Sequence, residues 1–148
     1  MLIQTLQSLF DRDLKNLKKE IGLYHSEEAI WHIEKNIANS GGNLCLHLIG
    51  NLNTYIGKEI GKTDYIRNRD LEFSAKNIAQ KELLTKVEDT ISVVNRSLNT
   101  LTQDDLLKEF PVVVFEKPTT TEYMLVHLAT HLTYHLGQIN YHRRLLDK

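Results

Sequence analysis

The chain has 148 residues, of which 41% are hydrophobic and 25% charged, as is typical of a globular domain with a buried core. Eighteen basic residues nearly balance nineteen acidic ones, and no run of lysine and arginine forms a nucleic-acid-binding patch. No apolar run reaches the roughly 20 residues that a membrane-spanning helix needs. We therefore expect a single domain over residues 1–148 that binds neither nucleic acid nor membrane.

The compartment follows from the N-terminal segment and the cysteine content. The first twenty residues lack the charged region and the small-residue cleavage site of a signal peptide. A single cysteine, Cys45, permits no internal disulfide and is read as a core residue. We expect a cytoplasmic protein.

The first helix is predicted over residues 2–20, where leucines and Phe10 recur at spacings of three and four. Residues 21–37 are predicted to form a connection, with one turn of helix after the N-cap residue Ser26.

A second helix is predicted to begin at the capping residues Asn39 and Ser40 and to continue to about Ile56. Two glycines in the segment that follows mark its end. The polar segment "KTDYIRNRDLEF", residues 62–73, is predicted to be a loop that leads to the third helix.

The third helix is predicted at about residues 75–100, and "TQDD" then opens a short turn. The one β-like piece is "EFPVVVFEKP", residues 109–118. The fourth helix starts with threonine caps and is unbroken over residues 119–146. Four long helices with moderate connections predict an all-α four-helix bundle.

The last predicted helix repeats histidine at every fourth residue, at His127, His131 and His135. Residues four apart project from the same side of a helix, so His131 and His135 can share one metal ion. Both lie on the edge of the core-facing leucine stripe and therefore point inward or into a cleft. Burying two unpaired imidazoles costs free energy, and metal coordination is one way to satisfy them.

A usable metal site needs a third ligand, and the second helix offers His47 among leucines in "NLCLHLIGNL". Three inward histidines from two neighbouring helices would form a set with open positions for water or substrate. The structural interpretation stays open beside it, because a histidine on an apolar face is often a hydrogen-bonded core residue. Nothing in the sequence fixes the direction of His25 or His32.

Two other histidines of the last helix are not predicted to bind this ion. His127 extends the series by one more turn, and three consecutive members cannot readily reach one ion. His142 is about 10 Å along the axis from His135, and we assign it to a solvated basic end with Arg143 and Arg144.

Three segments resemble the DinB/YfiT-like superfamily. They are "NSGGNLCLHLIGNL", "HLTYHLGQI" and "RNRDLEF", the last similar to the signature of an uncharacterised branch, and together they cover most of the chain from Asn39 onward. The resemblance implies a DinB-like four-helix bundle. It also implies a metal held by His47, His131 and His135 and completed by water, with zinc, nickel or iron as the ion.

The resemblance also implies a function. Members of the superfamily include thiol-dependent transferases and isomerases that use bacillithiol, mycothiol or glutathione. We therefore expect a metal-dependent enzyme that transfers a low-molecular-weight thiol to a small-molecule electrophile. A metal-dependent hydrolase is the near alternative, and a non-enzymatic metal-binding or interaction module is the alternative of another class. We expect a homodimer in either case.

Several residues near these motifs keep two interpretations. Gln138 either orients a ligand or is a packing or surface amide. The segment "RNRDLEF" either contributes to the mouth of the site or to a subunit contact, or is a solvated loop that ties down the third helix. Its charged candidates are Arg67, Arg69, Asp70 and Glu72. The conceivable general bases are Glu59, Asp64, Glu72 and Glu122, and spacing singles out none of them.

Overall fold

The computed structural model describes residues 1–148 and has the predicted all-α architecture. Four long helices form the bundle: α1 (Leu2–Leu23), α3 (Gly41–Leu52), α5 (Gln80–Leu98) and α6 (Thr121–Leu146). The shorter pieces are α2 (Glu27–Ile30), a π-helical extension of α3 termed η1 (Asn53–Lys58), α4 (Arg69–Ser74) and the 3₁₀ turn η2 (Asp104–Leu107). None of these helices combines the length and hydropathy that crossing a bilayer would require.

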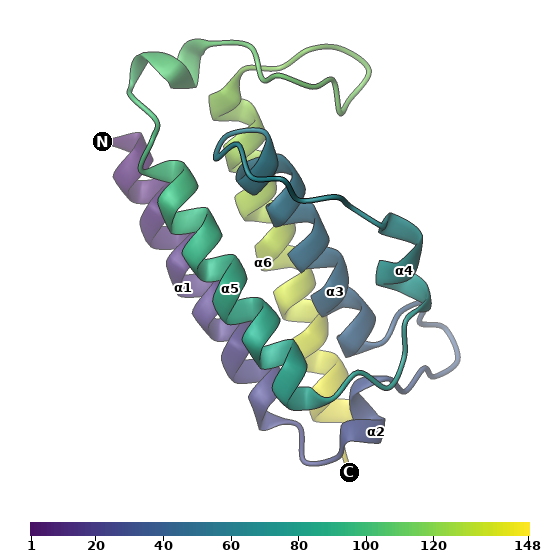
Figure 1. Ribbon diagram of the computed structural model, residues 1–148. Coiled ribbons are helices and arrows are strands. Elements are labelled where there is room, and N and C mark those ends of the chain that lie inside the picture. The colour runs from purple at the N-terminus through teal and green to yellow at the C-terminus, as the bar shows by residue number, and fades with distance from the viewer.

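Each long helix packs against two others: α1 and α3 each lie between α5 and α6, and the pairs α1–α5 and α3–α6 are antiparallel (Figure 1). In Figure 1 the chain descends through α1, ascends through both α3 and α5, and descends through α6 to the C-terminus. Because α3 and α5 run in the same direction, the chain must return along the outside of the bundle between them. That return carries α4, which packs on α3.

The caps that the sequence predicts are present. The hydroxyl of Ser26 accepts a hydrogen bond from the Ala29 amide, and that of Ser40 accepts one from the Asn43 amide. These bonds satisfy amides that have no partner within the helix. The first helix is three residues longer than predicted, since it ends at Leu23.

Three predictions about individual segments were wrong. The third helix begins at Gln80 instead of about residue 75, because Asn77 adopts a positive φ of 61° that interrupts a right-handed helix. The predicted loop 62–73 ends in the short helix α4, which Asn68 caps by accepting from the Leu71 amide. The β-like piece forms no strand, only an isolated bridge between Glu109 and Thr120.

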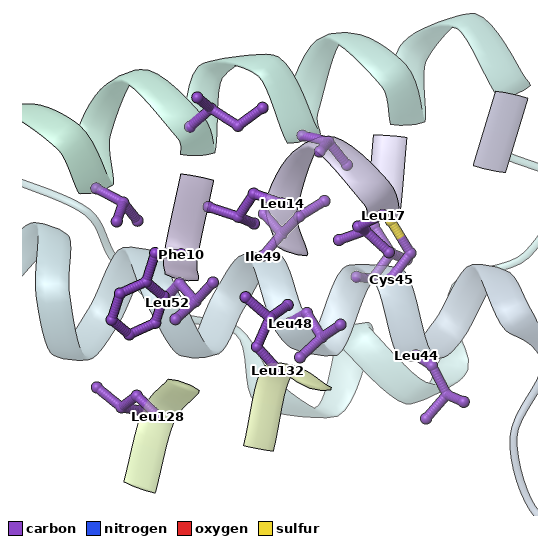
Figure 2. Packing of buried hydrophobic residues seen from close by; sticks show 14 of the residues in the cluster. Phe10, Leu14, Leu17, Leu44, Cys45, Leu48, Ile49, Leu52, Leu128 and Leu132 are labelled. Atoms are coloured by element: carbon purple, nitrogen blue, oxygen red, sulfur yellow. The ribbon is translucent and has the colours of Figure 1, made fainter. Parts of the chain in front are cut away.

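A single cluster of buried apolar side chains joins the four long helices. Figure 2 shows part of this cluster, with Phe10 of α1 beside Leu52 of α3 and Leu128 of α6. Full burial of one such side chain contributes about 1.5–3 kcal/mol. Every residue of α3 is buried, because α4 covers the face that the other long helices leave open. Polar residues of α3 are therefore inside the protein.

Candidate metal site

Three histidines from two helices point their ring Nε2 atoms at one another. The Nε2 atom of His131 is 3.2 Å from that of His47 and 3.1 Å from that of His135. His47 comes from the middle of α3, and the other two lie one turn apart on α6. The structure thus brings together the three residues that the sequence analysis selected as ligands, although His47 and His131 are 84 positions apart.

These distances fit a metal ion with imidazole ligands. A zinc–nitrogen bond of about 2.0–2.1 Å and ligand angles between 90° and 110° place neighbouring nitrogens about 2.8–3.4 Å apart. The ligand atoms of the three histidines form the only such group of His, Cys, Asp and Glu in the chain. The donor set and its spacing therefore fit a transition metal with three protein ligands.

The tautomer of His47 is set by a carboxylate. Its Nδ1–H donates to Glu72 Oε1 over 3.1 Å, and both side chains are buried, with 7% and 6% exposed area. Burial alone would raise the pKa of Glu72, but hydrogen bonds from His47 and Arg67 and the Arg67 charge hold it below its usual value. The ionised carboxylate only accepts hydrogen bonds. The lone pair of His47 is therefore at Nε2, facing the other two histidines.

His135 is oriented by an amide on its own helix. Its Nδ1–H donates to the side-chain carbonyl of Gln138, three residues further along α6, over 2.7 Å. This contact agrees with the interpretation in which Gln138 orients a ligand. Two of the three inward nitrogens thus carry lone pairs that a cation would satisfy.

His131 lies between the other two and is the most perturbed of the three. Burial, together with the neighbouring histidines, lowers its pKa to about 4. Its Nδ1 is buried without a hydrogen-bond partner, and its ring stacks on His127 at a centroid distance of 6.0 Å. The pKa of His135 is also lowered, first by burial. Both rings are therefore neutral at neutral pH, the form that binds metal.

Glu72 is held by contacts on both its side chain and its backbone. Arg67 donates to both carboxylate oxygens, from Nε and Nη2, at 2.9 Å each. The Asn43 amide donates to the backbone carbonyls of Glu72, over 3.0 Å, and of Ala75, over 2.8 Å. Asn43 itself is one turn before His47 on α3. Helix α4 is thus tied to the helix that carries the candidate ligand.

The carboxylate reaches His47 because the residue beside it on α3 is a glycine. A Cβ added to Gly50 would overlap Glu72 Oε2 and lie 2.5 Å from its Cδ. The sequence analysis did not select Gly50, and nothing in its immediate sequence distinguishes it from an ordinary helix glycine. The space that it leaves is visible only once α4 is in place.

Only part of "RNRDLEF" belongs to the site. Glu72 hydrogen-bonds to His47 and Arg67 pairs with Glu72, so the interpretation of a merely solvated loop is wrong for these two residues. Arg69 is exposed and contacts the Phe73 ring, and Asp70 is exposed.

Among the four candidate general bases, only Glu72 is at the site. Glu59 and Glu122 are partly buried and Asp64 is exposed, and none of them hydrogen-bonds to a histidine. Both oxygens of Glu72 are engaged by Arg67 and His47. Glu72 is therefore placed to hold a ligand.

The sequence analysis also missed two asparagines. Asn43, His47 and Asn51 form a polar series at a spacing of four in an otherwise apolar helix, and that spacing could have indicated them. The side-chain carbonyl of Asn51 is buried without a hydrogen-bond partner. Asn51 is thus a buried polar group one turn from His47 whose carbonyl oxygen has no partner in the protein.

The prediction for His142 was wrong. This side chain is 6% exposed, accepts a hydrogen bond from the Tyr24 hydroxyl at Nδ1 over 2.7 Å and donates from Nε2 to the His32 carbonyl. The connection after α1 folds over the end of α6 and covers it. Arg143 likewise pairs with Glu20 at 2.8 Å. His142 is a structural residue of the interior.

Gln138, which contacts His135, also lines a pocket of about 520 Å³ that none of the three candidate ligands lines. The connection at residues 34–39, Leu44 of α3 and the C-terminal half of α6 line it, with Tyr141 and Leu145 as its large apolar side chains. Its volume is within the range of small-molecule pockets.

Comparison with known families identifies one family for the chain. A family model described as "Protein of unknown function (DUF1572)" matches residues 2–148. A search of curated proteins finds no match. The DUF1572 family is part of the DinB/YfiT-like clan, so the resemblance noted from the motifs is confirmed at that level. Because the match covers nearly the whole chain, the protein belongs to the DUF1572 family of the DinB/YfiT-like clan.

Proposed function

We propose that the protein binds one divalent transition metal through His47, His131 and His135 and uses it in an enzymatic reaction on a small molecule. The observation that carries the proposal is the convergence of three Nε2 atoms at 3.1–3.2 Å, two of them fixed as lone-pair donors. Neutral imidazoles suit zinc, nickel and iron alike, and we propose one of these ions.

The chemistry that we propose is transfer of a low-molecular-weight thiol, of the bacillithiol or glutathione kind, to an electrophile. When bound, the ion would act as a Lewis acid that lowers the pKa of a coordinated thiol or water. Three protein ligands leave positions for such a molecule. The thiol must come from a cofactor, because Cys45 is fully buried and burial raises its pKa to about 12. The assignment of thiol transfer itself rests on the clan resemblance.

The pocket beside Gln138 supports a small-molecule substrate. It is large enough for a thiol cofactor or for the non-reacting part of an electrophile, and it mixes apolar and polar lining residues.

Hydrolysis is the second candidate, since a metal with three histidine ligands also lowers the pKa of water. A hydrolase would need a group to accept the proton of the attacking water. The only carboxylate at the site, Glu72, has both oxygens engaged. This arrangement favours thiol transfer over hydrolysis.

We also propose that the protein works as a homodimer in the cytoplasm. Exposed apolar side chains on α6, such as Val126 and Tyr134, support an interface on this helix. Sedimentation equilibrium would give the mass in solution, and a monomer at all concentrations would contradict the proposal.

Elemental analysis tests the metal site directly. Untagged protein is purified without chelator, beside the variants His47→Ala, His131→Ala and His135→Ala, with His127→Ala as the matched control on α6. We expect about one transition metal per chain in the parent and in the control and little in the other three. Circular dichroism checks that all variants fold. No metal in the parent after incubation with zinc, nickel and iron would overturn the proposal.

Thiol transfer is then assayed with the metal that the parent retains. Bacillithiol and glutathione are supplied with a model electrophile, and loss of free thiol is followed. We expect turnover by the parent and by the His127→Ala control, and none by the His131→Ala variant. A loaded parent that hydrolyses ester or amide substrates but consumes no thiol would favour the hydrolase.

A further inference from the structure

We infer that Glu72 is the positioning residue that makes His47 a metal ligand, and that Gly50 is a glycine in order to admit the Glu72 carboxylate. This inference deepens the proposed metal function. Its consequence for metal affinity rests on that function. Its first part, the state of the His47 ring, holds for the metal-free protein as well. Neither residue is among the ligands themselves.

The two ring nitrogens of His47 decide whether this residue can bind a metal. A neutral imidazole carries its proton on either Nδ1 or Nε2, and only the first form leaves Nε2 free for a metal. Glu72 Oε1 lies 3.1 Å from Nδ1, and as a carboxylate it accepts but does not donate. The form with the proton on Nδ1 is therefore favoured, and the ring is held with Nε2 toward α6.

Glu72 differs in charge from the other hydrogen-bond partners of the three histidines. His135 is oriented by the neutral amide of Gln138, and His131 Nδ1 has no partner. Glu72 is the one charged acceptor that touches a ligand ring, and it crosses from α4 to α3 to do so. Removal of such an outer-shell partner typically costs 10–100-fold in metal affinity.

Gly50 leaves the space on α3 that the Glu72 carboxylate fills. A methyl group there would overlap Oε2, which is the far end of a flexible side chain and can swing away. Gly50→Ala would thus displace the carboxylate while leaving the α3 backbone in place. Alanine is also a better helix former than glycine, so the substitution does not weaken α3 by itself.

These steps lead to a test with a matched pair of glycines. Gly50→Ala and Gly137→Ala each add one methyl group to a long helix, but a Cβ at Gly137 meets no atom within 4 Å. Zn²⁺ affinity is measured by competition with a chromophoric chelator. We expect Gly50→Ala and Glu72→Ala to bind Zn²⁺ about 10–100-fold more weakly than the parent, and Gly137→Ala to bind it as the parent does.

The double variant Gly50→Ala/Glu72→Ala shows whether the two residues act as one. If Gly50 matters only because it admits the carboxylate, the double variant binds Zn²⁺ no more weakly than Glu72→Ala alone. Unchanged affinity in Gly50→Ala, or a further loss of the same size in the Glu72→Ala background, would overturn the inference.

Nitrogen NMR of the imidazoles in the metal-free protein separates this inference from the proposed function. We expect His47 to carry its proton on Nδ1 in the parent and in Gly137→Ala, and to exchange between both forms in Gly50→Ala and Glu72→Ala. That result supports the role of Glu72 even if the parent binds no Zn²⁺, in which case the metal function alone fails. The same tautomer in all four proteins would overturn the inference.

Discussion

The histidines of this protein have different tasks that their residue type does not reveal. The Nε2 atoms of His47, His131 and His135 face one another and have no other hydrogen-bond partner in the protein. His142 has both ring nitrogens hydrogen-bonded, to the Tyr24 hydroxyl and to the His32 carbonyl. Neither nitrogen of His142 faces another histidine ring, and both are satisfied by oxygen atoms of the protein, so His142 belongs to the fold.

Tyr24→Phe tests that distinction. The substitution keeps the ring but removes the hydroxyl that donates to His142 Nδ1, and so leaves a buried acceptor unpaired. We expect a loss of about 1–3 kcal/mol in the free energy of unfolding, with unchanged metal content. Urea denaturation and elemental analysis measure the two. A loss of metal with full stability would mean that His142 serves the metal site instead.

At the scale of elements, α4 reverses the usual polarity of a surface helix. Leu71 is 54% exposed, whereas Glu72 is 6% exposed. Such a six-residue helix is not stable alone and depends on its contacts with α3. The backbone of α4 is held to α3 by the hydrogen bonds that the Asn43 side chain donates to the Glu72 and Ala75 carbonyls.

Asn43→Ala should therefore loosen α4 and weaken the metal site together. Two buried carbonyls lose their donor, and we expect a destabilisation of about 1–3 kcal/mol and weaker Zn²⁺ binding. Leu71→Ala, on the exposed side of α4, is the control and should change neither. Hydrogen exchange at α4 amides would report the loosening. Unaltered Zn²⁺ affinity in Asn43→Ala would show that α4 needs no tether to hold Glu72.

The same reversal explains what could be predicted from the sequence. Periodic leucines located α1 and α6, and hydroxyl caps located α2 and α3, because these signals are local. In α4 Leu71 is exposed and Glu72 is buried, so hydrophobic periodicity gives no clear signal there. The partners His135 and Gln138 lie three residues apart on one helix, whereas His47 and Glu72 are 25 residues apart and meet only through the fold. The three candidate ligands could be selected from the sequence, but the residue that orients His47, Glu72, could not.

At the scale of the whole molecule, buried ionisable groups make stability depend on pH. Burial lowers the pKa of His131, to about 4, and also that of His135 and His142. Between pH 6.5 and about 4 the unfolded chain thus binds more protons than the folded one, and stability falls as the pH falls. The lowered pKa of Glu72, buried but held by His47 and Arg67, acts in the same direction at lower pH.

We therefore expect the metal-free protein to keep its full stability above about pH 6.5 and to lose it progressively down to about pH 4. Thermal melts across this range, in a chelating buffer, measure the effect. His142→Phe, which removes one of the three histidines, should reduce the slope. A melting temperature that is constant from pH 7 to pH 4.5 would contradict the assignment of neutral buried histidines.

The shared volume of Gly50 and Glu72 constrains how this family can diverge. Any side chain at position 50 competes for space with the carboxylate of Glu72. The order in which these two positions change therefore matters for the support of His47. Loss of the acid first frees the glycine to vary, whereas loss of the glycine first displaces the acid from His47. Among DUF1572 sequences, alanine or larger residues at the position of Gly50 are expected where the position of Glu72 is no longer acidic. Ancestral reconstruction across the family would show whether the acid was lost first.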